Sequence, residues 1–249
     1  MAHNPSDLRI EIITSLRDVL PAFICTRNTF GNQTHDGIWL AMNPECDTPE
    51  GISRGAQRMT KRWLEAVKAR NNDGNLNTIF LKATVPDPEK PGEHRLVGIA
   101  IWVQASAVEG HGDVPAEDLS AVLDLEALYP GNKTEQRYLV QLDRSLHRKR
   151  IEVVKEKATA SPPAVMVLDL CAVDPAYQGK GIAKKLVQWG LDEASRRGGL
   201  EAITEASSMG RHVYAKLGFK PDETEIVYDV DAEFAGRERP SNLFMRTGP

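Results

Sequence analysis

The chain has 249 residues, of which 41% are hydrophobic and 27% charged, a composition typical of folded globular proteins that excludes a disordered chain. Its formal net charge of -4 gives no general attraction to nucleic acid or to an anionic membrane, so we expect neither as a partner. The N-terminus lacks the pattern of a secretory signal, and no apolar run is long enough to span a bilayer. We therefore expect a cytoplasmic protein.

The chain shows no internal repeat and no long linker, which favours one domain over two small ones. Its three cysteines, Cys25, Cys46 and Cys171, are widely spaced and form no C-x-x-C pair. They suggest neither a disulfide framework nor a zinc site. We expect no metal.

The N-terminal part of the chain predicts a strand followed by helices. Apolar and polar residues alternate over 8–12, which is typical of a strand, and a mostly helical and looped stretch follows over 17–69. Within it, the apolar residues of 56–67 recur at helical spacing. The sequence Asn71-Asn72-Asp73-Gly74 should then stop the helix.

Two apolar, β-branched runs at 77–85 and 96–103 come next, and the proline-rich segment between them predicts a hairpin with a long connection. From 106 to 163 the pattern changes to acidic and then basic helical segments. Asn132 and Glu135 could form a capping box at the start of a long helix. In that helix, the run Arg148-Lys149-Arg150 is expected to be a solvated surface.

The rest of the chain alternates strands and helices, which predicts a mixed α/β sheet. The first of these strands is apolar at nearly every position, so we expect it to be central and covered on both faces. In chain order the expected elements are a strand at 164–173, a helix at 182–197, a strand at 200–206, a short helix at 211–219, a strand near 225–230 and a possible edge strand at 242–245.

A glycine-containing turn joins the central strand to the next helix. Gly179 and Gly181 let the backbone approach a ligand closely, and their amides could converge with the positive end of the helix to make a cradle for phosphate or pyrophosphate. Tight turns also use glycine for steric reasons alone, so the pair by itself leaves both interpretations open. The turn matches neither the P-loop nor the dinucleotide-binding pattern.

The sequence around this turn resembles a known family. The order of strand, Q-x-x-G-x-A turn at 178–183, amphipathic helix, strand and then the Y-x-x-L-G-F segment at 214–219 is similar to the GNAT superfamily of acyl-CoA N-acyltransferases, in particular to fungal-type GNAT-like acetyltransferases. The resemblance covers about 165–220. It implies one α/β (α+β) domain over 1–249, with helices around a mixed, mostly antiparallel twisted sheet that splays where coenzyme A enters. A helical insertion at about 106–163 lies outside the family pattern.

The resemblance also implies a coenzyme site. The backbone amides that would receive the pyrophosphate are those of Gln178, Gly179, Lys180, Gly181, Ile182 and Ala183. Main-chain groups of Cys171 and Val173 would hold the pantetheine arm. Ser207 stands where many relatives have an asparagine that contacts the coenzyme, and this departure leaves that contact open. Cys171 could be imagined to form an acyl-cysteine, but a small buried side chain is the favoured interpretation, because the family ordinarily transfers the acyl group directly.

Tyr214 matches the tyrosine that many family members place near the coenzyme sulfur, so the resemblance implies that it protonates the leaving thiolate as a general acid. The alternative is that Tyr214 only packs with Leu217 and Phe219 in the core. His212 is two residues away on the same short helix and should face elsewhere, exposed or capping.

The general base is less well defined by the sequence. Asp169 is the one carboxylate in the central strand, and strand alternation would place it on the same side as Val167, Cys171 and Val173. Apolar surroundings would raise its pKa, which suits removal of a proton from an ammonium group. Glu205, at the end of the next strand, is the competitor. Either carboxylate could instead be paired with a basic side chain or with backbone amides.

These features predict an enzyme that transfers an acetyl group from acetyl-CoA to a primary amine of a small molecule by direct attack, working as a monomer or homodimer. The acceptor is selected by loops and N-terminal helices that vary freely, so its identity is not predicted. Two alternatives remain: an acyl-CoA-binding regulatory protein with little or no turnover, and a protein or peptide N-acetyltransferase.

Overall fold

The computed structural model describes residues 7–248, and its strands form one twisted sheet in the order β1-β2-β3-β4-β5-β7-β6. All neighbouring pairs are antiparallel except β4 with β5. The mixed, mostly antiparallel sheet is therefore confirmed, with β4 at its centre. The strands are β1 (Arg9–Ile12), β2 (Thr78–Pro86), β3 (His94–Ala105), β4 (Val165–Val173), β5 (Glu201–Ser207), β6 (Lys220–Glu225) and β7 (Asn242–Arg246).

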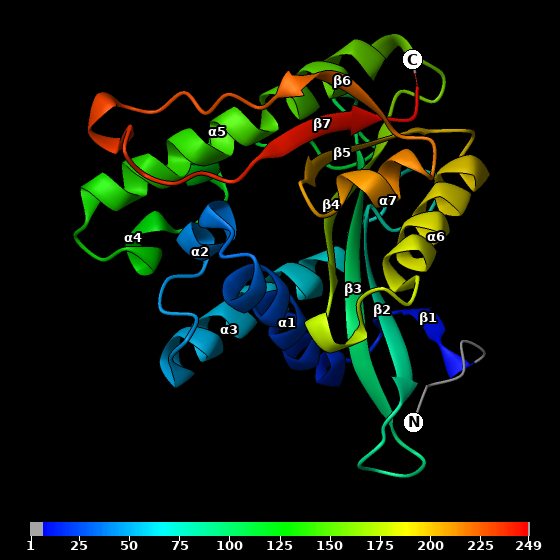
Figure 1. The fold of residues 1–249 in the computed structure, drawn as a ribbon. Coiled ribbons are helices and arrows are strands. Elements are labelled where there is room, and N and C mark those ends of the chain that lie inside the picture. Colours follow the sequence, from blue (N-terminus) through cyan, green and yellow to red (C-terminus); the bar gives the residue numbers. More distant parts are fainter. Residues whose placement is uncertain (1–6, 249) are drawn as a thin grey trace.

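Helices cover both faces of this sheet (Figure 1). One face carries α6, with the short α7 beside it, whereas α1, α3 and α5 pack on the other. Among the described residues, no helix combines the length and the apolar character that crossing a bilayer requires. The helices are α1 (Val19–Thr26), α2 (Gly37–Met42), α3 (Pro49–Ala66), α4 (Leu125–Leu128), α5 (Lys133–Glu156), α6 (Ile182–Arg196) and α7 (Arg211–Ala215).

Close packing between α6 and the sheet depends on one glycine. Trp102 of β3 is fully buried, and a Cβ added at Gly190 of α6 would lie 1.9 Å from its indole ring. Any larger side chain at 190 would therefore push the helix away from the sheet. This contact fixes the height of α6 above β3 and β4, and with it the position of the turn that precedes the helix.

The first strand, the hairpin and the helical stretch between them are confirmed, but two expected boundaries are wrong. Helix α3 ends at Ala66, before the Asn71–Gly74 turn. At the C-terminus, 242–246 is not an edge strand, because it inserts as β7 between β5 and β6. The edge strand at this end of the sheet is β6. It ends at Glu225, whereas the sequence predicted a strand near 225–230.

The segment after β6 does not continue the sheet because it runs along α5 instead (Figure 1). The rings of Tyr138 on α5 and Phe234 lie 4.8 Å apart, and the Arg237 guanidinium stacks on both. Arg237 also binds the Glu135 carboxylate. The expected capping box is thus half formed: Asn132 caps the Glu135 amide at 3.2 Å, while the Glu135 side chain turns to the C-terminal segment.

Candidate functional site

The central strands β4 and β5 separate halfway along their length. They pair in parallel only from Val165 to Val167, opposite 201–203. The last link is the Thr204 hydroxyl, which donates to the Leu168 carbonyl at 3.0 Å. Beyond it β4 pairs with β3 alone, so its other edge has no neighbouring strand. This is the splay that the family resemblance implied.

A β-bulge marks the start of the splay. Trp102 of β3 pairs with Leu168 and Ile101 pairs with Leu170, which leaves Asp169 as an extra residue in β4. The bulge reverses the alternation of side chains. Asp169 lies before the reversal and shares the α3 and α5 side with Val167, as alternation predicts. Cys171 and Val173 lie after it and pack on the α6 side, so the expectation that they share the side of Asp169 is wrong.

The turn between β4 and α6 presents its backbone outward. Gly179 and Gly181 have φ angles of 75° and 76°, a conformation that favours glycine. Within residues 7–248, the amides of Gly179, Lys180 and Gly181 donate to no protein acceptor, and the amides of Ile182 and Ala183 lie in the first helical turn, where no intrahelical partner exists. A Cβ placed at either glycine meets nothing within 4 Å. The turn thus offers a row of free donors at the positive end of a helix.

Gln178 holds this turn against the end of β4. Its side-chain amide donates to the Val173 carbonyl at 2.9 Å and exchanges two hydrogen bonds with Gln33, at 2.8 and 2.9 Å. Sequence reasoning missed Gln33, which lies 145 residues away in the chain. The Val173 carbonyl also accepts from Thr29 at 3.0 Å. With both of its lone pairs used, this carbonyl is not free to hold a pantetheine amide.

Tyr214 and Cys171 meet on the α6 side of the splay. The Tyr214 ring is buried 5.9 Å from Phe219, as the packing alternative expected, and its hydroxyl interacts with the Cys171 thiol. Burial raises the pKa of Tyr214 well above its ordinary value and raises that of Cys171 to about 12, although the interaction with Tyr214 opposes the latter shift. Both groups therefore keep their protons at neutral pH. Cys171 has no nucleophilic thiolate, and Tyr214 can act as a proton donor.

Two further predicted positions lie at the edge of this region. The Ser207 hydroxyl accepts from the Gly210 amide at 3.2 Å, so it shapes the turn into α7. His212 is exposed on α7, as expected.

On the opposite side of β4, a buried network of charged side chains occupies the bulge. Asp169 accepts from Arg62 of α3 at 2.7 Å and from Arg150 of α5 at 2.6 Å. Arg150 also binds Glu205 through two of its nitrogens. The Arg150 side chain is only 11% exposed, so the expectation that 148–150 is a solvated surface is wrong for this residue. The i, i+4 geometry of α5 turns it inward while Arg148 remains exposed.

This network overturns the expected pKa of Asp169. Burial alone would raise the pKa, but the charges of Arg62, Arg150 and His147 and the hydrogen bond from Arg62 outweigh it and hold the pKa well below its ordinary value. Asp169 is consequently a carboxylate with little tendency to take up a proton. Glu205 is paired in the same way, so the alternative of carboxylates paired to basic side chains is confirmed.

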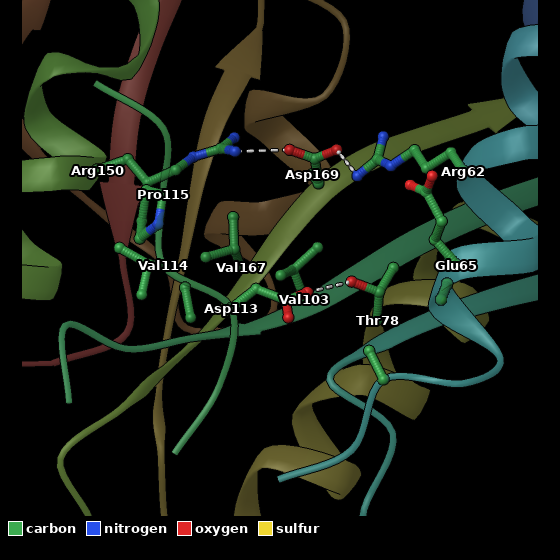
Figure 2. A pocket seen from close by; sticks show the side chains of 13 residues that line it. Arg62, Glu65, Thr78, Val103, Asp113, Val114, Pro115, Arg150, Val167 and Asp169 are labelled. Atoms are coloured by element: carbon green, nitrogen blue, oxygen red, sulfur yellow. Dashed lines mark hydrogen bonds and ion pairs between the residues drawn. The ribbon is translucent and has the colours of Figure 1, made fainter. Parts of the chain in front are cut away.

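A pocket of about 360 Å³ opens beside the network, between α3, α5 and the sheet (Figure 2). It lies on the face of β4 opposite α6 and reaches the bulge at Asp169. In the described chain, this pocket included, no group of three or more histidine, cysteine or acidic side chains is arranged to hold a metal ion.

Comparison with known proteins agrees with this geometry. Residues 147–221 match the model of the Acetyltransferase (GNAT) domain. Over 79 residues the chain is 33% identical to a glucosamine 6-phosphate N-acetyltransferase of Trypanosoma brucei brucei. The match covers 31% of this chain and 53% of the relative, so the chain spans about half the length of that curated relative.

Two solved structures share the fold over nearly their whole length. One is arylalkylamine N-acetyltransferase 2 of Aedes aegypti, with a TM-score of 0.60, 19% identity and coverage of 96% of this chain and 98% of that one. The other is a mosquito arylalkylamine N-acetyltransferase-like protein, 5b, with a TM-score of 0.59, 14% identity and the same coverage. At these identities the likeness concerns the fold alone. Residues 147–221, which contain β4, the turn, α6 and α7, thus match a GNAT acetyltransferase domain, and the whole chain has the fold of the two compared structures.

Proposed function

We propose that the chain is an acyl-CoA-dependent N-acyltransferase that moves an acetyl group from acetyl-CoA to a primary amine. One observation carries this proposal: a free strand edge leads directly to a turn with free amides. Strand β4 loses its partner strand at Leu168, and the turn that follows β4 presents unbonded amides from Gly179 to Ala183. An extended pantetheine arm fits beside the free strand edge, and a pyrophosphate fits at the turn. The proposal treats 106–163 as a helical insertion in one domain.

Each coenzyme contact falls to a group that the protein leaves available. We assign the pyrophosphate to the backbone amides of 179–183 and the pantetheine arm to the main chain of Cys171. The expected contact from the Gln178 amide is left out, because that amide donates to the Pro175 carbonyl at 3.4 Å. Val173 contributes only its backbone N–H to the pantetheine arm, because its carbonyl already accepts two hydrogen bonds. Ser207 contributes by shaping the turn before α7.

The chemistry follows from the groups around the splay. The amine nitrogen attacks the thioester carbonyl carbon, and main-chain amides near Cys171 stabilise the oxyanion of the tetrahedral intermediate. As the C–S bond breaks, the sulfur takes the proton of the Tyr214 hydroxyl, which its raised pKa keeps in place until that moment. We assign Asp169 an electrostatic role, because it stays ionised and its charge offsets those of Arg62 and Arg150 beside the acceptor site. Water removes one proton from the acceptor's ammonium before attack, so that its nitrogen has a lone pair. The proton that the nitrogen loses after attack returns to the Tyr214 oxygen through water.

The named relatives support an amine acceptor: one is a glucosamine 6-phosphate N-acetyltransferase and another an arylalkylamine N-acetyltransferase. The experiment incubates the protein with acetyl-CoA and a panel of arylalkylamines, amino sugars, aliphatic amines and peptides, and follows free thiol. Thiol release with small amines is the expected result. Release with peptides only would make the chain a protein or peptide N-acetyltransferase. Thermal stabilisation by acetyl-CoA without any turnover would make it a regulatory protein, and no stabilisation at all would contradict the proposal.

A further inference from the structure

The pocket beside Asp169 has an apolar floor and a charged rim. It is too small for a folded partner, and its volume of about 360 Å³ lies at the lower end of the range for small-molecule sites. Three of its lining residues, 113–115, and Arg150 belong to the insertion. The apolar part of the lining is formed by Ala66, Ala69, Val103, Ala105, Val114, Pro115 and Val167.

The charges around the pocket do not cancel. The network formed by Arg62, Arg150, Asp169 and Glu205 holds two positive and two negative groups in mutual hydrogen bonds. Two further carboxylates line the pocket without a cation, and they leave it with a net negative charge. These are Glu65 and Asp113.

Asp113 is held in place at the end of the pocket away from the bulge (Figure 2). Its two oxygens accept from the Asn77 amide at 2.8 Å and the Thr78 hydroxyl at 2.9 Å, both neutral donors. Its backbone bonds Gln104 and Ser106, so it cannot easily move. A carboxylate accepts about four hydrogen bonds.

Glu65 stands on α3, one turn after Arg62, and lines the pocket (Figure 2). Over residues 7–248 no basic side chain pairs with it. Val114 belongs to the apolar lining of the pocket, yet it is 70% exposed. A ligand with an aliphatic body would cover it.

We infer that this pocket takes the acceptor, and that it selects small aliphatic amines with a second positive charge, such as diamines and amino-guanidines. This inference rests on the proposed function. Thr78, Val103 and Val167 are neighbours across three strands, so about 10 Å separates Thr78, whose hydroxyl binds Asp113, from Val167, two residues before Asp169. An acceptor of that length places one ammonium near Asp169 and its second cation on Asp113. Acceptors carrying phosphate or carboxylate are disfavoured by the same charges.

The test compares diamines with monoamines of the same length. We expect the parent to use 1,6-diaminohexane with a kcat/KM about tenfold or more above hexylamine, since only the diamine makes a charge-assisted hydrogen bond to Asp113. Asp113→Asn should lower kcat/KM for the diamines about tenfold and leave the monoamines within about threefold. Glu65→Gln, on an exposed helix face, should act in the same direction.

Glu109→Gln is the matched control, because Glu109 is exposed on the same loop as Asp113 and lies outside the pocket. Melting temperature and acetyl-CoA affinity should match the parent in all variants. Equal use of diamines and monoamines, or an equal loss for both in Asp113→Asn, would overturn the inference while leaving the acyltransferase proposal standing. If acetyl-CoA binds but no amine is acetylated, calorimetry tests the pocket directly. We then expect 1,6-diaminohexane to bind the parent but not Asp113→Asn, and any other result would overturn the pocket assignment.

Discussion

The two sides of β4 at its bulge are built in different ways. On the α6 side, strand, turn, helix and Tyr214 all come from the contiguous segment 165–219, and the groups offered to a ligand are mostly backbone amides. On the α3 and α5 side, the groups are charged side chains drawn from four distant segments: Arg62, Asp113, Arg150 and Glu205.

This difference predicts how each side responds to change. A backbone cradle tolerates most substitutions except those that fill it or alter its conformation. A buried charge network fails when any one partner is removed, because the remaining charges stay desolvated. Mutations on the α6 side should therefore affect coenzyme binding or chemistry, whereas mutations of the network should first affect stability.

The largest kinetic effect is expected from Tyr214→Phe. Removing the hydroxyl should lower kcat and kcat/KM together by roughly 10²- to 10⁴-fold, the usual contribution of a general acid, with coenzyme affinity unchanged within a few-fold. The ring still packs on Phe219, so stability should hardly change. Tyr129→Phe is the control, since it removes a hydroxyl that bonds the Ala41 carbonyl at 2.7 Å, away from the splay. A fall of less than about threefold, with chemistry rate-limiting, would make Tyr214 a core residue only.

The largest stability effect is expected from Arg150→Met. It leaves Glu205, whose side chain is 3% exposed, as a buried charge without a partner, and should lower the free energy of unfolding by about 3–5 kcal/mol at neutral pH. Arg148→Met changes an exposed neighbour on the same helix and should cost less than about 0.5 kcal/mol. Urea denaturation measures both. Equal costs for the two variants would show that the network contributes nothing to stability.

A smaller, pH-dependent effect is expected from Asp169→Asn. Because the folded-state pKa of Asp169 is lowered, its ionised form stabilises the protein above the unfolded pKa of about 3.9, and this stability is lost as pH falls toward the folded pKa. The variant should therefore be about 1.5–3 kcal/mol less stable than the parent at pH 7, with the difference shrinking below about pH 4.

Turnover provides a second measurement on the same variant. Asp169 is already ionised throughout the neutral range, so the pH profiles of kcat for parent and Asp169→Asn should have the same shape. If an acid limb present in the parent disappears in the variant, Asp169 is the general base after all.

The sequence was informative where function depends on local backbone geometry. The glycines of 178–183 and the apolar stripe of α6 define the turn, because the conformation that they require belongs to neighbouring residues. The alternation rule failed beyond Asp169, at Cys171 and Val173, since a bulge is set by pairing with β3 and leaves no mark in β4 itself. The partners Arg62, Arg150 and Gln33 were not predictable, because each depends on which helices meet across the sheet.

The central claim, that the turn before α6 receives the coenzyme pyrophosphate, is tested most directly by acetyl-CoA affinity in two glycine variants. Gly181 and Gly199 have φ angles of 76° and 75°, and a Cβ at either meets nothing within 4 Å, so Gly181→Asp and Gly199→Asp impose the same backbone strain. By calorimetry we expect Gly181→Asp to weaken acetyl-CoA binding by about 100-fold or more, because its carboxylate replaces a phosphate site at the helix start, with Gly199→Asp within about threefold of the parent. Equal affinity in the two variants would contradict the account.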